Sequence, residues 1–232
     1  MSGDPYRDYQ PIQPSSGLNV RRALQRALGA LVAIGTAALK FGFIFVKFFG
    51  FFISFAAYSL WFHSWTFGLG FVLLILVHEL GHAFEARRQG LHVSAPTFIP
   101  FFGAYVTIRH SGLSPWRSSL ISLAGPFAGG LAAAAVWAVG ESRGSPMLIA
   151  LANIGFLLNA FNLLPIGFLD GGSVAHSIRE AWRTPVIQYE GAVPVQALAP
   201  DRTRALLIAT LYVALVGALV IGMLATRTNG ML

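Results

Sequence analysis

The sequence has no cysteine and few charged residues. The missing cysteine excludes disulfides, thiolate nucleophiles and cysteine metal ligands from a chain of 232 residues. Any metal site must therefore use histidine, aspartate or glutamate. Charged residues make up 11%, against about 25% in ordinary soluble domains. Hydrophobic residues make up 55%, and the mean hydropathy is +0.65. This composition predicts a membrane protein.

The excess of positive charge is not arranged for binding nucleic acid. Lysine and arginine total 16 and aspartate and glutamate total 9, which gives a net charge of +7 and an isoelectric point near 10.4. The basic residues are scattered between apolar segments and form no patch. Such residues are typical of topology signals that face anionic lipid. We therefore predict the lipid bilayer as a partner and no nucleic acid.

Long apolar runs predict an all-α polytopic membrane protein. A largely apolar stretch with a turn near Ser64 is long enough for two crossings, and three uncharged runs follow it. These segments are residues 27–79, 118–140, 144–169 and 205–226. We expect about five to six transmembrane helices, five as the main count and six if residues 27–46 also cross.

Arginine clusters suggest how the chain is oriented. They lie before the first expected crossing, after the second and after the fourth, at residues 21–26, 87–117 and 179–204. The positive-inside rule places all three in the cytosol. We expect an integral protein of the cell inner membrane. Residues 1–26 would form a flexible cytosolic tail, and residues 27–232 a single membrane-embedded domain with its core at 64–172.

Residues 93–108 are apolar but too short to cross a bilayer. They include Pro96, Pro100 and Gly103. Because proline cannot donate to a strand ladder, the segment is expected to form an edge strand or an irregular re-entrant loop. A simple interfacial loop is the alternative.

The pattern His78-Glu79-Leu80-Gly81-His82 stands at the end of the second expected crossing. Histidines at i and i+4 lie on one face of a helix, where both can reach one Zn²⁺, and the glutamate between them can act as a general base. The alternative is a set of polar residues at a helix end. A carboxylate near the hydrocarbon costs about 2.5–3.5 kcal/mol on insertion scales, which favours a functional role.

A catalytic zinc needs a third protein ligand, and Asp170 is the best candidate. Apart from Glu79, the other acidic residues lie in the N-terminal tail, in hydrophilic stretches or next to the arginine pair at 87–88, which leaves Asp170 at the end of the apolar run 144–169. Pro165 is expected to end the preceding helix after Leu164, and the following glycines let the backbone turn sharply. A helix-terminal Asp-Gly turn without metal is the alternative.

Three motifs together resemble the site-2 protease family of intramembrane zinc metalloproteases. They are His78-Glu-Leu-Gly-His82, Ser122-Leu-Ala-Gly-Pro126 and Asn162-Leu-Leu-Pro165 followed by Asp170-Gly-Gly172. The resemblance implies that His78, His82 and Asp170 bind Zn²⁺. It also implies that Glu79 activates water and that Asn162 positions the substrate or stabilises the oxyanion.

The resemblance further implies a reaction and a substrate class. The expected activity is hydrolysis of a peptide bond in or near a transmembrane segment. The arginine clusters, rather than the resemblance, lead us to expect the site towards the cytosolic side. The expected substrate is a single-span membrane protein or a signal-peptide remnant, which pairs with residues 93–108 after local unwinding. Two features depart from the family pattern. Gly129 and Gly130 lie where many members carry asparagine shortly after Ala-Gly-Pro, and we expect no PDZ or CBS domain in these 232 residues.

Two functions of another class compete with proteolysis. The same ligands could serve a metal-ion transporter or a zinc-stabilised, non-catalytic scaffold. A transporter would spread polar groups along its path, yet residues 118–140 and 205–226 contain no charged residue and no histidine. A scaffold has no need of Glu79. The histidines outside the motif are expected to be solvated: His63, His92, His110 and His176.

Overall fold

The computed structural model describes residues 20–99, 103–109, 112–183, 186–190, 193–198 and 200–227. The chain divides into two compact units, residues 1–46 and 47–232, and the candidate site lies in the second. Residues 1–19 of the expected tail, and His110, lie outside the described residues. Residues 20–26, also assigned to the tail, are the first turns of a helix.

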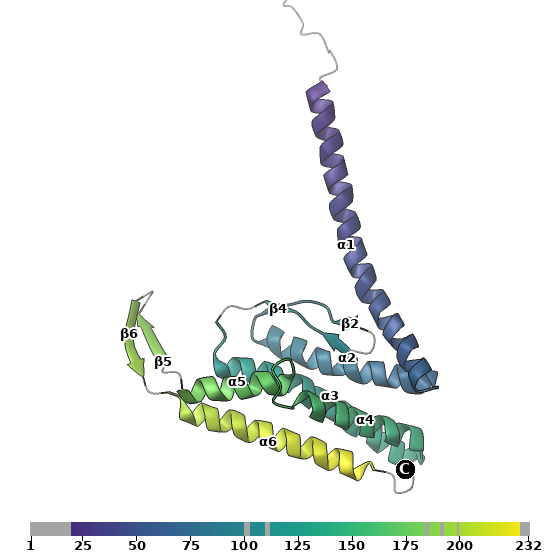
Figure 1. Ribbon diagram of the computed structural model, residues 1–232, viewed down its shortest axis with the longest axis vertical. Coiled ribbons are helices and arrows are strands. Elements are labelled where there is room, and N and C mark those ends of the chain that lie inside the picture. The colour runs from purple at the N-terminus through teal and green to yellow at the C-terminus, as the bar shows by residue number, and fades with distance from the viewer. Residues whose placement is uncertain are drawn as a thin grey trace, which may run out of the picture. The chain divides into compact units, whose positions relative to one another are not determined.

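The described residues form six helices and six short strands (Figure 1). The helices are α1 (Val20–Trp61), α2 (Trp65–Arg88), α3 (Pro115–Arg143), α4 (Pro146–Asn162), α5 (Asp170–Arg183) and α6 (Arg202–Ala225). The strands are β1 (His92–Val93), β2 (Thr97–Ile99), β3 (Gly103–Tyr105), β4 (Ile108–Arg109), β5 (Val186–Glu190) and β6 (Val193–Leu198). The mostly helical class expected from the sequence is confirmed.

Three of the described helices are long and apolar enough to cross a membrane: α2, α3 and α6. Helix α4 and two parts of α1, Leu24–Thr36 and Phe49–Trp61, are apolar but shorter. Large apolar side chains are exposed along these helices, as expected where lipid replaces water. The chain is therefore an integral membrane protein.

Serine residues mark where three of the helices begin. Ser64 caps α2 by accepting a hydrogen bond from the Phe67 backbone N–H, which confirms the turn expected near residue 64. Ser114 and Ser145 cap α3 and α4, each followed by a proline in the first helical turn, where its missing N–H costs nothing. Gly144 ends α3 in the left-handed conformation, with φ of 56°.

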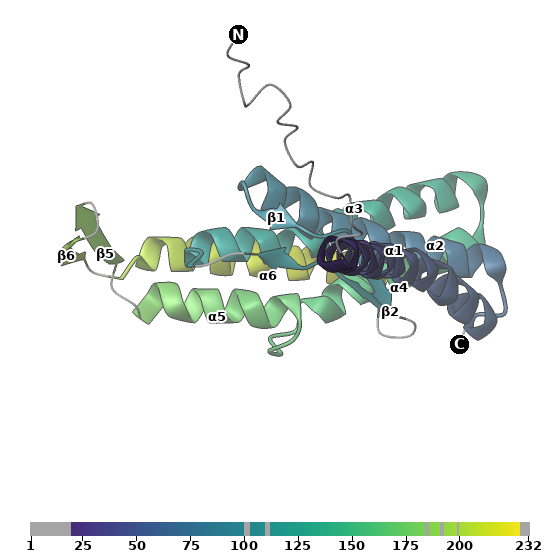
Figure 2. The ribbon, with the colours of Figure 1, turned by 90° about the horizontal axis from the view of Figure 1, so that it is seen from above.

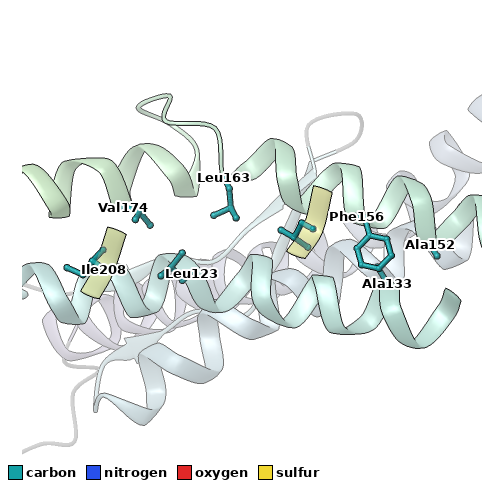
Figure 3. Close-up of a cluster of buried hydrophobic side chains, with 8 residues drawn as sticks. Leu123, Ala133, Ala152, Phe156, Leu163, Val174 and Ile208 are labelled. Carbon is teal, nitrogen blue, oxygen red and sulfur yellow. The ribbon is translucent and has the colours of Figure 1, made fainter. Parts of the chain in front are cut away.

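The core of the second unit forms where α3, α4, α5 and α6 meet. Helix α3 packs along α2 and α4, while α6 packs along α4 and α5. Figure 3 shows one cluster of buried side chains between these helices, with Leu163 placed where the chain leaves α4 and Val174 on α5. A second cluster includes Tyr58, Phe71 and Phe98 and joins the end of α1 to α2 and β2. The end of α4 and the start of α5 are thus fixed by core packing.

Residues 93–108 form paired strands against α2. Strand β1 pairs with β4 and β2 pairs with β3, both antiparallel, and β1 and β3 contact α2. The expectation of a β element is confirmed, and a simple interfacial loop is not what forms. Residues 100–102 lie outside the described residues.

Two features differ from the sequence expectation. Strands β5 and β6 form an antiparallel pair between α5 and α6, and no strands were expected there (Figure 2). Helix α4 ends at Asn162 rather than Leu164. The residue before proline avoids the helical region, and the Leu163 and Leu164 N–H groups instead make tighter bonds to Ala160 and Phe161. The run 144–169 is therefore a helix followed by a connecting turn.

Candidate metal centre

Three side chains from two helices converge on one point. His78 and His82 lie one turn apart on α2, and Asp170 opens α5. The two Nε2 atoms are 3.1 Å apart, and Asp170 Oδ2 lies 3.2 Å from His78 Nε2 and 3.3 Å from His82 Nε2. Both histidines are buried, at 4% and 9% exposure. The three residues expected as ligands are thus brought together.

The hydrogen bonds of the imidazole rings define which nitrogens carry protons. His78 Nδ1 lies 2.8 Å from Asn159 Oδ1, and His82 Nδ1 lies 2.8 Å from Ile121 O. The Asn159 amide donates to Gly155 O through Nδ2 at 2.7 Å, so its oxygen faces the ring. Because both partners are acceptors, each Nδ1 must carry the proton. Two neutral rings would therefore point Nε2 lone pairs at a carboxylate oxygen.

Such a cluster needs a positive charge at its centre. A proton on one of the two rings would be one such charge. Burial raises the pKa of the Asp170 carboxyl, but the contacts with His78 and His82 outweigh the effect of burial and lower this pKa to about 2. However, the separations of 3.1, 3.2 and 3.3 Å exceed the roughly 2.7–2.9 Å of a charge-assisted hydrogen bond. They approach the edge of about 3.3 Å that a tetrahedron has when its zinc–ligand distance is about 2.0–2.1 Å. Among the described residues, the buried Asp170 Oδ2 also has no hydrogen-bond partner. The donor set therefore fits Zn²⁺.

The connection from α4 to α5 holds Asp170 in place. Tyr212 of α6 donates a hydrogen bond to Leu163 O, where this connection begins. A Cβ on Gly171 would overlap Leu163 O, and a Cβ on Gly172 would overlap Ile166 O. The two glycines are thus needed because the connection lies directly against the first turn of α5. The N-terminal end of that helix also favours the negative charge of Asp170.

Glycines on α3 give the metal centre its space. A Cβ on Gly125 would overlap the His82 ring, and a Cβ on Gly129 would overlap the side-chain amide of Asn159. A Cβ on Gly81 of α2 would overlap Ala124 O. These close approaches place α3 directly against His82 and against Asn159, the partner of His78.

Glu79 lies beside the candidate ligands. Its side chain is buried, at 7% exposure, and its charge interacts with His78, His82 and Asp170. The backbone N–H of Val106, in the connection from β3 to β4, donates to the Glu79 carboxylate. The residue expected as general base is therefore next to the metal centre and in contact with the β element.

Asn162 is near the end of α4, but its side chain is turned to its own helix. It is half-buried, and its Nδ2 donates to Leu158 O at 3.1 Å. Asn159, one turn earlier, is fully buried and contacts His78. Asn159 lies three residues before the motif that begins at Asn162, and the sequence alone assigned it no role. This spacing was the one sequence signal that the two asparagines lie on the same face of a helix.

The remaining described histidines lie elsewhere. His63 and His92 are exposed, and His176 is exposed with its Nε2 3.7 Å from Glu180 Oε2. Within the described residues, His78, His82 and Asp170 form the one group that could hold a metal ion. These three histidines are thus exposed and lie outside the candidate metal centre.

Comparison with known proteins agrees with this geometry. Residues 66–145 match the model of peptidase family M50, a segment that contains the two histidines and ends before Asp170. A candidate zinc metalloprotease of Synechocystis is 31% identical over 136 residues, which cover 55% of this chain and 35% of the relative. The resemblance to the site-2 proteases is confirmed.

Two more relatives extend this similarity. The candidate zinc metalloprotease Rip3 of Mycobacterium tuberculosis is 33% identical over 132 residues, covering 51% of this chain and 33% of the relative. A zinc metalloprotease of Methanocaldococcus jannaschii is 27% identical over 116 residues, covering 47% of this chain and 33% of the relative. The matches span about a third of each of these relatives (35%, 33% and 33%). Zn²⁺ is the cofactor that the donor set and the relatives' names both indicate.

Proposed function

We propose that this chain is an intramembrane zinc metalloprotease that hydrolyses a peptide bond in or near a transmembrane segment of a membrane protein. The observation that carries the proposal is the convergence of two Nε2 atoms and Asp170 Oδ2 at 3.1–3.3 Å, next to buried Glu79. A zinc ion held there would polarise the scissile carbonyl and make a water molecule acidic enough to attack it.

Glu79 would move the proton in this reaction. Its carboxylate lies at the centre, accepts a hydrogen bond from the Val106 N–H and follows His78 directly on α2. As general base it takes a proton from the attacking water, and as general acid it delivers that proton to the leaving amine. A scaffold or a transporter has no need of such a group.

Asn162 would hold the substrate rather than move a proton. Its Nδ2 now donates to Leu158 O, and rotation about the side-chain bonds would turn this donor from its own helix towards a bound peptide. A donor aimed at the developing negative charge of the carbonyl oxygen stabilises the transition state.

The strands over α2 suggest how a helical substrate would bind. Within the described residues, β2 and β3 pair only with each other, so each has one edge without a strand partner. A substrate helix must unwind to expose its carbonyl, and pairing with such an edge would replace the lost backbone bonds. The Val106 contact to Glu79 would keep this edge close to the reacting groups.

The orientation follows from the arginines near the ends of α2 and α3. Arg87 and Arg88 end α2, and Arg117 in the first turn of α3 donates to the backbone oxygen of Gln89. The positive-inside rule places this end in the cytosol, and we infer five to six crossings in an inner membrane with the site towards the cytosolic side. Residues 64–172 would then hold the whole catalytic set, within a membrane-embedded domain formed by residues 27–232 and after a cytosolic tail of residues 1–26.

Cleavage and zinc transport can be separated in one preparation. The purified chain is placed in lipid vesicles with a panel of labelled single-span membrane proteins and signal-peptide remnants. We expect about one zinc ion per chain, fragments cut within the apolar segment, loss of cleavage after chelation and recovery after zinc is restored. Zinc flux into the vesicles without cleavage of any substrate would instead support the transporter.

A further inference from the structure

Within the described residues, Asn159 is the one side chain that hydrogen-bonds to an imidazole of the metal centre through Nδ1, the ring nitrogen that faces away from the candidate metal position. It is fully buried in α4, with Oδ1 2.8 Å from His78 Nδ1. The corresponding partner of His82 is the backbone oxygen of Ile121. The His78 ring is therefore oriented by a side chain, which a mutation can replace, and the His82 ring by a main-chain oxygen.

The amide of Asn159 can face His78 in only one way. Its Nδ2 donates to Gly155 O at 2.7 Å, and a carbonyl cannot donate in return. The Asn159 oxygen must then accept from His78 Nδ1, which keeps the proton on Nδ1 and the lone pair on Nε2. Only a ring in that tautomer can offer Nε2 to a metal ion.

Helix α3 is shaped to admit this amide. A Cβ on Gly129 would overlap both Oδ1 and Nδ2 of Asn159. Gly129 and Asn159 are both buried, so neither the amide nor the backbone facing it can turn to solvent. The packing of Asn159 against Gly129 therefore holds the acceptor of the His78 Nδ1–H in a fixed position.

We propose that Asn159 is a positioning residue that selects the metal-binding tautomer of His78 and fixes its ring, and that Gly129 provides the space this requires. The inference rests on the proposed zinc centre. Partners that orient a ligating histidine typically change metal affinity by about 10-fold to 100-fold when removed. The effect is therefore expected on zinc affinity, before any effect on cleavage.

The test measures zinc affinity by competition with a chelator for the purified full chain. Asn159→Leu should weaken zinc binding about 10-fold to 100-fold, because the buried Nδ1–H loses its acceptor. Asn153→Leu is the matched control: Asn153 is also on α4, but it donates to Met223 O and Thr226 Oγ1. It should lower the melting temperature and leave zinc affinity unchanged.

A second pair of variants distinguishes loss of the Asn159 amide from a general loss of folding. Asn159→Ala should weaken zinc binding, and Gly129→Asn added to it should restore part of the affinity, since the new amide would occupy the space of the old one. The visible spectrum of the cobalt-substituted chain should change in Asn159→Leu and recover in the double variant. These readouts do not depend on cleavage.

The outcomes separate the two claims. Zinc bound by the wild type with unchanged affinity in Asn159→Leu, an equal fall in Asn153→Leu, or no recovery in the double variant would each overturn the positioning role. A wild-type chain that binds no zinc would instead overturn the proposed metal centre itself.

Discussion

Gly125 of α3 lies directly against the imidazole of His82, and a Cβ at position 125 would overlap Nε2, Cε1 and Cδ2 of the ring. These atoms lie at the candidate metal centre, where Nε2 is the proposed ligand atom. The Ala-Gly-Pro segment lies within α3 and contacts the candidate metal centre directly. Its glycine lets α3 approach the metal centre closely enough for Ile121 O to accept from His82 Nδ1.

Gly125→Ala should therefore displace the His82 ring and reduce zinc binding. We expect the purified variant to hold well below one zinc ion per chain, because a centre with one displaced ligand binds metal weakly. Gly217→Ala is the control: Gly217 is on α6, where a Cβ would have nothing within 4 Å. A full zinc content in Gly125→Ala, measured by metal analysis, would contradict the arrangement described for α3.

Asp170→Ala should lose both zinc and cleavage. Two histidines remain in that variant, and a catalytic zinc is usually held by three protein ligands. Asp201→Ala provides a matched control, since Asp201 also stands at a helix start and its side chain accepts from the Arg204 N–H. That variant should lose about 0.5–2 kcal/mol of stability and keep its zinc. Full zinc occupancy in Asp170→Ala would mean that the third ligand is another residue.

A proline in β3 tests whether the strands bind substrate. Ala104 pairs with Phe98 of β2, and Ala104→Pro removes one backbone donor from this hairpin. Cleavage of a helical membrane substrate should fall strongly at unchanged zinc content, while Ala104→Ser should cleave normally. Val106→Pro is less specific, because the Val106 N–H donates to Glu79. Near-normal cleavage by Ala104→Pro would refute the strand-pairing proposal.

The metal centre could be predicted from the sequence because its residues obey strong local rules. His78 and His82 are one helical turn apart whatever the fold, and Asp170 stands at the end of an apolar run before two glycines. Gly171 and Gly172 were expected to let the backbone turn. In the structure they matter because a Cβ on either would overlap the backbone oxygen of Leu163 or Ile166.

The supporting residues could not be predicted in the same way. Asn159 reaches His78 only because α4 packs beside α2 and α3, and single-sequence periodicity does not define such neighbours. Ile121 contributes a backbone oxygen, and because every residue type has one, the sequence cannot indicate this contact. The β5–β6 pair was not expected from the sequence at all.

The most direct test of the central claim is cleavage by Glu79→Gln with zinc content measured on the same sample. Glutamine keeps the size of Glu79 but cannot accept a proton, so we expect one zinc ion per chain, near-complete loss of turnover and uncleaved substrate still bound. Glu85→Gln is the control on the same helix, because Glu85 is also buried but pairs with Arg88 at 2.7 Å. It should cleave at the wild-type rate. Substantial hydrolysis by zinc-loaded Glu79→Gln would contradict the account.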